Sequence, residues 1–318
     1  MSLKLPDQAW LTSNLQGPCA PMIYSDIRRP RGQRVEEGFV TLFIAIAMLT
    51  MIAKAQNASD IPQQAGRSER VGEFVNSGWT EYEKVLSKAI SIRAQKLEEK
   101  TGFRFDRNWM PNVSLEWSLG TGVNGFNGMY KAETQTIYFP IRVVYELTAR
   151  HKQSWSSLNA DTVAQDDELA ELLDHELGHE LMDQVSRRNG LGPWFTEDRF
   201  ARSSAGEKLG LDILSEGTAL FFQRLNSRRD ESDLSPQAFP ATWEEQRFYP
   251  YRMVAYEGGY WIVRDVLNQY GERGLIWLMR HPFVARDDMR TAAVTYRDLA
   301  LRELSKKNEL ERTGGALD

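Results

Sequence analysis

The chain has 318 residues, which is long enough for one large domain or two small ones with a sizeable hydrophobic core. Its charged fraction of 26% and hydrophobic fraction of 42% are ordinary for a soluble globular protein. The net charge is −5 and no basic patch stands out in the sequence, so composition provides no electrostatic reason for binding nucleic acid. We therefore expect no nucleic acid partner.

An uncharged apolar run near the N-terminus predicts export. This run, Phe39–Ala53, is shorter than the ~20 residues that a membrane-spanning helix needs. The basic stretch "RRPRGQR" precedes it, and small residues at Ala53 and Ala55 stand at the positions of a cleavage site. The pattern is typical of a signal peptide. It predicts a leader over residues 1–55 and a periplasmic or extracellular mature chain; the alternative is an uncleaved leader that anchors the protein to a membrane.

The leader has two candidate starts. Met22 would give a leader of ordinary length, and it would remove Cys19, the only cysteine of the chain. With either start, the expected mature chain has no cysteine and therefore no disulfide. Residues 56–70 are polar and predict a linker that leads into a domain spanning 71–318.

The first part of this domain predicts a helix followed by a small sheet. Apolar residues recur at three- and four-residue steps over 71–100, which indicates an amphipathic helix, and Thr101-Gly102 is a plausible stop. Alternation in "VSLEWSL" (113–119) and two extended runs around a polar turn within 127–140 predict short strands. We expect the sheet to be mainly antiparallel.

The rest of the domain predicts helices. A helical pattern covers 162–188, with Asp161 as its N-cap and Asn189-Gly190 as its stop, and a loop follows over 191–208. Further helices are expected near 208–226 and 252–270, and shorter helices finish the chain. The order of helix, sheet and helices indicates an α+β domain with a helical C-terminal half.

The motif "HELGH" lies within the helix expected over 162–188. His175 and His179 are two of the four histidines of the chain, and residues four apart share one helical face, with about 5–6 Å between their Cβ atoms. Two imidazoles so placed can bind one zinc ion. Glu176 adjoins the first of them, where a carboxylate can accept a proton from a water held by the metal. The motif therefore predicts two metal ligands and a general base on one helix.

A third ligand must come from elsewhere, because catalytic zinc usually has three protein ligands. Glu216, in "DILSEGTALFF", is the best candidate: a carboxylate among apolar neighbours needs a cation or a hydrogen-bonding partner. Small residues at Gly217 and Ala219 would let its helix pack close to the first. His151 and His281 have no recognisable ligand context. The competing ligands are Asp212, Glu207, Asp198 and Glu197.

Three segments together resemble a known family. "HELGH" with the later "SEGTA" is similar to the zincin metallopeptidases of the gluzincin branch. "YEGGYWIVRDVLNQYGERGLIWLM" (256–279) resembles the segment that follows the glutamate helix in several gluzincin families. The resemblance extends from Glu168 to about Trp277. It implies a zincin-like fold and a Zn²⁺ site, with these residues in the site: His175, His179 and Glu216 as ligands and Glu176 as the base.

The resemblance also implies roles around the zinc. A Tyr often stabilises the oxyanion in these families, and Tyr256 is the matching position, with Tyr260 second. The chain departs from the pattern in its longer gap before Glu216 and at Leu220, where some members carry an Asp. Either of two other carboxylates is then a candidate to orient a ligand, namely Asp183 or Asp212.

These features predict an exported zinc-dependent metallopeptidase that acts on a peptide or protein substrate. By resemblance, the strand within 134–140 is an edge strand that pairs with the extended substrate backbone. The alternative is a catalytically inactive zincin-fold binding protein. Glu176 argues against this alternative, because a protein that only holds metal does not need that carboxylate.

Overall fold

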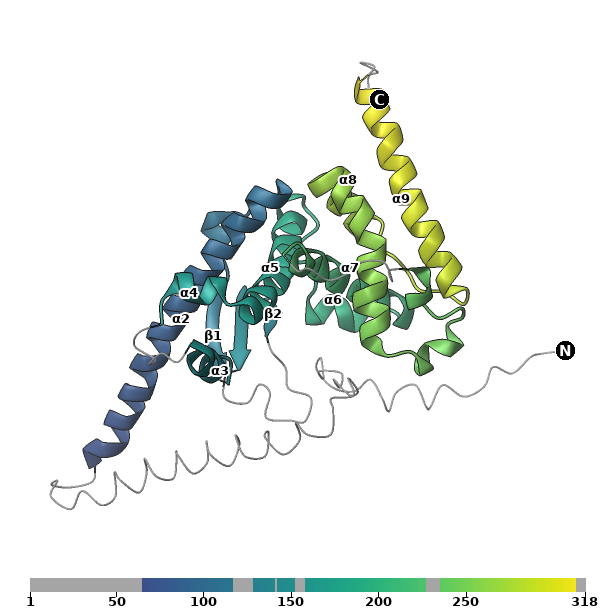
Figure 1. The fold of residues 1–318 in the computed structure, drawn as a ribbon. Helices are drawn as coiled ribbons and strands as arrows, with labels where there is room; N and C mark the ends of the chain where they lie inside the picture. Colours follow the sequence, from purple (N-terminus) through teal and green to yellow (C-terminus); the bar gives the residue numbers. More distant parts are fainter. Residues whose placement is uncertain (1–64, 117–127, 141, 152–157, 227–234, 313–318) are drawn as a thin grey trace. The chain divides into compact units, whose positions relative to one another are not determined.

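The computed structural model describes residues 65–116, 128–140, 142–151, 158–226 and 235–312 (Figure 1). The described residues fall into two units, one ending at Glu81 and the other beginning at Tyr82. All residues of the candidate site belong to the second unit. The predicted signal-peptide run, Phe39–Ala53, lies outside the described residues. Among the helices that are described, none is long and apolar enough to cross a membrane.

Helix α2, Ala65–Thr101, confirms the helix predicted over 71–100 and begins within the predicted linker. Its core side chains recur at helical steps: Leu86, Ile90, Ala94 and Leu97. The helix ends at Gly102, whose φ of 74° lies in the left-handed region that favours glycine. The Gly102 amide donates a hydrogen bond of 2.9 Å to the Glu98 carbonyl and so closes the last turn.

The sheet contains β1 (Asn112–Glu116), β2 (Met129–Lys131) and β3 (Thr136–Pro140), in the order β1-β3-β2. β2 and β3 form the expected antiparallel pair, but β1 runs parallel to β3, with Asn112 opposite Thr136. The prediction of a mainly antiparallel sheet is therefore wrong, because the longer of the two pairings is parallel. Alternation along a strand reports which face is buried, but it does not report the direction of the neighbouring strand.

β3 is the middle strand of these three, and its Ile137 and Phe139 side chains are fully buried. The strand within 134–140 is therefore not an edge strand of the described sheet, contrary to the expectation from the resemblance. β2 is the edge strand on the side of the candidate site, since it contacts helix α5 (Asp167–Arg188). Both faces of β3 are covered, which is why a strand so rich in hydrophobic residues lies in the core.

Helices make up most of the described chain, so the fold is mixed and mainly helical, with a small sheet. After α2 they are α3 (Arg142–His151), α4 (Ala160–Gln165), α5 (Asp167–Arg188), α6 (Glu197–Arg202), α7 (Ala205–Arg224), α8 (Gly259–Arg280) and α9 (Met289–Arg312). Short 3-10 turns cover Arg107–Trp109, Pro236–Ala238 and Glu244–Phe248, and a π-helical turn, Met253–Gly258, leads into α8.

Two expectations about the C-terminal half are wrong. α6 occupies part of the stretch expected to be a loop, because Thr196 caps it by accepting a hydrogen bond from the Arg199 amide. α9 is a single long helix in place of several short ones. Its buried residues recur at helical steps where it packs against α8: Met289, Ala293, Ala300 and Leu304.

The helix predicted over 162–188 is broken at Asp166, which ends α4 and caps α5. Asp166 has extended backbone angles (φ −66°, ψ 118°), and its carboxylate accepts a hydrogen bond of 3.0 Å from the Leu169 amide. The expected N-cap, Asp161, is wrong, because Asn159 caps α4 instead. Arg150 and His151 of α3 also bind the Asp166 carboxylate, so this one side chain joins α3 to the start of the motif helix.

Acid is expected to remove a stabilising contribution of Asp166. Burial raises the pKa of its carboxyl, but hydrogen bonds from Arg150, the Leu169 amide and His151 outweigh burial and hold the pKa below its ordinary value. A carboxyl with a lowered pKa in the folded state stabilises the fold above its unfolded-state pKa of about 3.9. That contribution is lost as the pH falls through the lowered pKa.

We therefore expect Asp166→Asn to lower the free energy of unfolding by about 1–3 kcal/mol near pH 6, with a much smaller effect at pH 3. Urea unfolding followed by circular dichroism at both pH values measures the difference. The exposed neighbour Asp167 provides the control, since Asp167→Asn removes the same charge one residue away. An effect of Asp166→Asn that is equally large at both pH values would contradict this account.

Small residues let α7 pack tightly between two helices. α7 contacts α5 on one side and α8 on another (Figure 1). A Cβ on Gly178 of α5 would lie 2.6 Å from the Ala219 Cα, and a Cβ on Gly217 would lie 2.3 Å from the Gly259 carbonyl carbon. Ala219 thus faces α5 as expected, whereas Gly217 serves the contact with α8. These contacts bring the helix that carries Glu216 against the helix that carries the "HELGH" motif.

Candidate metal centre

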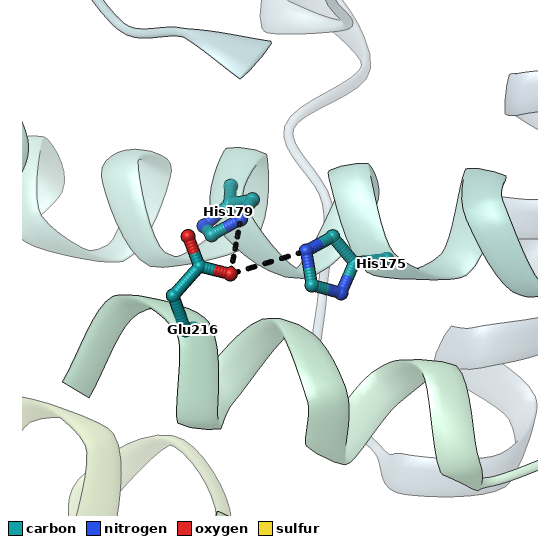
Figure 2. A group of neighbouring side chains, drawn as sticks. All are labelled: His175, His179 and Glu216. Carbon is teal, nitrogen blue, oxygen red and sulfur yellow. Dashed lines mark ion pairs between the residues drawn. The ribbon is translucent and has the colours of Figure 1, made fainter. Parts of the chain in front are cut away.

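Two neighbouring helices bring three potential metal ligands together. His175 and His179 project from successive turns of α5, and Glu216 projects toward them from α7, as Figure 2 shows. Their candidate ligand atoms all lie within 4.8 Å of one another. Glu216 Oε2 lies 3.3 Å from His175 Nε2 and 3.7 Å from His179 Nε2. The predicted pair on one helix and the predicted third residue on another thus form one cluster.

The donor set of this cluster fits a divalent metal ion. Glu216 Oε2 is a buried oxygen with no hydrogen bond of ordinary geometry within the described part of the chain. Burial raises the pKa of the Glu216 carboxyl, but the adjacent imidazoles and a hydrogen bond from Tyr256 outweigh burial and lower it. A buried carboxylate beside two imidazole nitrogens needs a positive charge. The cluster of His175, His179 and Glu216 could therefore hold a metal ion.

The other ring nitrogen of each histidine has an oxygen partner on α7. His179 Nδ1 lies 2.9 Å from Ser215 Oγ, and His175 Nδ1 lies 3.2 Å from Gln223 Oε1. An amide oxygen only accepts, so Nδ1 of His175 carries the proton. Nε2 of each ring faces the Glu216 carboxylate. Partners of this kind fix the ring orientation and the tautomer that a metal requires.

Among the described contacts, neither Asp183 nor Asp212 has a hydrogen bond to a candidate ligand. Asp183 instead accepts hydrogen bonds from the Trp194 amide, Tyr130 and Arg187. The described contact of Asp212 is with Tyr251. Ser215 and Gln223 were missed because hydroxyl and amide side chains on a helix carry no distinctive sequence signal. Only the packing of α5 on α7 shows that they face the histidines.

The pKa values of the two imidazoles are shifted in opposite directions. Burial lowers the pKa of His179 to about 4, which favours the neutral ring that binds metal. Burial also lowers the pKa of His175, but the hydrogen bond and charge of Glu216 outweigh it, so the net shift is upward. Both nitrogens of His175 face acceptor oxygens, so Nε2 and the Glu216 carboxylate would hold either a proton or a metal ion.

Glu176 lies beside the cluster but is not part of it. Its side chain is buried, and burial raises the pKa of its carboxyl to about 7. The backbone amide of Tyr130 on β2 donates a hydrogen bond to the carboxylate, while Oε2 is buried without a hydrogen-bond partner in the described chain. A Cβ on Gly128 would lie 3.1 Å from Glu176 Oε1, so glycine lets the start of the β2 strand approach this carboxylate.

Of the two predicted tyrosines, Tyr256 reaches the cluster. Its ring stacks on His175, with 5.6 Å between ring centroids and 9° between ring planes, and its hydroxyl donates a hydrogen bond to the Glu216 carboxylate. Tyr260 is buried one turn later, with the guanidinium of Arg224 4.7 Å from its ring centroid. The structure thus brings Tyr256, and not Tyr260, against the predicted ligands.

Three of the four competing acidic residues, and the two other histidines, lie outside the ligand cluster. Glu207 completes the capping box of α7 with Ser204, and exposed Asp198 pairs with Arg202. Asp212 lies half-buried one turn before Glu216, and desolvation raises the pKa of its carboxyl to about 7. The two remaining histidines pair with neighbours outside the cluster, His151 with Asp166 and His281 with Trp277.

The chain was compared with protein-family models, curated proteins and solved structures, and no similar protein was found in any of the three.

Proposed function

We propose that this protein is an exported zinc-dependent metallopeptidase with a zincin-like fold, in the domain over 71–318. The observation that carries the proposal is the convergence of His175, His179 and Glu216, with Glu176 adjacent on the same helix. Two histidines and one glutamate are a donor set of catalytic zinc sites, which keep an open position. The resemblance of "HELGH" and "SEGTA" to gluzincins supports the same conclusion.

Zinc, when bound, supplies Lewis-acid chemistry: it lowers the pKa of water and polarises a carbonyl. The protein's own part falls to Glu176. We assign its Oε2 as the atom that accepts the proton from the attacking water, because this buried oxygen has no hydrogen-bond partner in the described chain. The Tyr130 amide holds the carboxylate in place. The same oxygen then passes the proton to the leaving amine of the cleaved peptide bond.

An extended substrate would add to the sheet beside this carboxylate. β2 is an edge strand of the described sheet, and it contacts the helix that carries Glu176. Strand addition satisfies the backbone hydrogen bonds of a peptide without requiring a particular side chain. This proposal replaces β3 with β2 as the strand that pairs with the substrate.

The resemblance to gluzincins assigns to Tyr256 the role of stabilising the oxyanion that forms during hydrolysis. Its side chain reaches the metal cluster, but its hydroxyl donates to Glu216. A phenol has one proton, so donation to an oxyanion would require this bond to be exchanged.

Export is a separate part of the proposal and rests on the leader over residues 1–55. Expression of the full chain in a bacterial host, followed by N-terminal sequencing, tests it. A mature N-terminus at Gln56 is expected. Recovery of the protein with an intact leader in the membrane fraction would mean that the enzyme is anchored to the membrane and not released.

Metal content and hydrolysis measured together test the peptidase. We expect the wild type to hold close to one zinc per chain and to hydrolyse casein. His179→Ala is expected to lose both, because it removes one of three ligands. His281→Ala is the matched control, since His281 is exposed and contacts Trp277. A wild type that binds no zinc after incubation with the ion would overturn the proposal.

A further inference from the structure

Tyr256 is held against the candidate metal ligands by an unusual local structure. It lies in the π-helical turn Met253–Gly258, which continues directly into α8. π-helical turns are rare in proteins, but many of those that occur lie at functional sites. The extra residue in such a turn shifts a side chain from its regular helical position. Here the shifted segment presents the Tyr256 ring to His175, with nearly parallel ring planes.

One side chain therefore contacts two of the three ligands. The Tyr256 ring covers His175 at a centroid distance of 5.6 Å, and the hydroxyl donates to the Glu216 carboxylate. This hydrogen bond favours the ionised carboxylate, which is the form that binds metal. His175 and His179 each have an oxygen partner at Nδ1, so Tyr256 supplies the corresponding support for the carboxylate ligand.

Contacts with neighbouring residues also fix the position of Tyr256. The Tyr251 ring contacts it edge to face, with centroids 6.4 Å apart, and the Tyr251 hydroxyl is hydrogen-bonded to half-buried Asp212. Backbone contact holds the end of the π-helical turn against α7. A Cβ on Gly259 would lie 2.2 Å from the Ile213 carbonyl oxygen, so this contact admits no side chain. The support of Tyr256 is thus attached to the helix that carries Glu216.

We propose that Tyr256 is a positioning residue of the metal centre: its hydroxyl orients the Glu216 carboxylate and its ring orients the His175 imidazole. This inference rests on the proposed metal site, but it does not depend on peptide hydrolysis. It differs from the oxyanion role, because the single hydroxyl proton is used by Glu216.

Zinc affinity of Tyr256→Phe in the full chain tests this role. Phe keeps the ring and removes only the hydroxyl, so the variant is expected to fold, with a melting curve as the check. We expect about 10–100-fold weaker zinc binding in competition with a chromophoric chelator. We also expect a changed visible spectrum of the cobalt-loaded protein, because the carboxylate would bind the metal in a different orientation. Tyr256→Leu, which also removes the ring, is expected to weaken binding further.

Tyr270→Phe is the matched control. It removes a hydroxyl from α8, where Tyr270 donates a hydrogen bond to the Leu301 carbonyl. Zinc affinity and the cobalt spectrum are expected to stay as in the wild type. If Tyr256→Phe also leaves both unchanged, the positioning role is wrong, and a fall in hydrolysis alone would assign Tyr256 to the oxyanion. A wild type that binds neither metal would instead overturn the metal site itself.

Discussion

Replacement of Glu176 by Gln is expected to reduce casein hydrolysis by about 10²–10⁴-fold or more while zinc content stays near the wild-type level. Gln has the shape of Glu but cannot accept the proton of the attacking water. The cluster of His175, His179 and Glu216 does not include Glu176, so its metal affinity should survive the change. Hydrolysis rate and zinc per chain, measured on the same preparation, separate the two effects.

Glu180→Gln provides the matched control for this experiment. Glu180 lies one turn further along α5, is fully buried, and also has a pKa raised to about 7 by burial. Its carboxylate binds the side chains of Gln184 and Tyr130, and it is not part of the ligand cluster. We expect Glu180→Gln to keep most of the hydrolysis. Equal losses in the two variants would mean that loss of any buried carboxylate on this helix impairs the protein, and Glu176 would lose its assignment as the base.

Gly217→Ala is expected to destabilise the protein and to weaken zinc binding. The added methyl would lie 2.3 Å from the Gly259 carbonyl carbon and 2.6 Å from the Gly259 Cα. α7 cannot move freely away from α8, because Ala219 is already in close contact with Gly178 on α5. Overpacking of this kind costs about 1–3 kcal/mol, and contact with backbone on both sides favours the upper end. Glu216 is the adjacent residue, so separation of the helices would also displace a metal ligand.

The sign of the change in the free energy of unfolding distinguishes overpacking from a simple gain in helix propensity. Ala is favoured over Gly inside a helix by about 1 kcal/mol, so helix propensity alone predicts that Gly217→Ala stabilises the protein. Thermal or urea unfolding of the metal-free chain measures the change without the contribution of zinc. A more stable variant would contradict the close approach of α7 and α8. A less stable variant with wild-type zinc affinity would mean that the close packing stabilises the fold but is not needed to position Glu216.

The chemistry at one helix was predictable from the sequence because helical spacing is local. His175 and His179 are four residues apart, and one helical turn brings such residues to the same face regardless of the rest of the fold. The end of α2 at Gly102 and the end of α5 at Asn189 follow from equally local preferences. Glu216 could be selected as a carboxylate among apolar residues, and the structure places it at the predicted cluster.

Local signals were less reliable where a side chain interacts with another element. The helical pattern over 162–188 continues through Asp166, but the hydrogen bonds of this residue to Arg150 and His151 favour a break and a new cap. The same limit applies to β1. Its alternation would be the same beside a parallel or an antiparallel neighbour, and only the path of the chain between strands makes it parallel to β3.

The support of the candidate metal centre was decided by tertiary structure alone. Ser215 and Gln223 meet the histidines because α7 packs against α5 at Gly178 and Ala219, and Tyr256 meets the ligands because its segment packs against α7 where Gly217 contacts Gly259. Ser215 and Gln223 are ordinary residues within α7, and the resemblance singles out Tyr256 only for a different role, at the oxyanion. The sequence by itself determined the histidine pair and a short set of candidate carboxylates, since residue type and helical spacing are local properties. Which residues orient them depends on contacts between segments far apart in the chain, and only the packed structure brings these together.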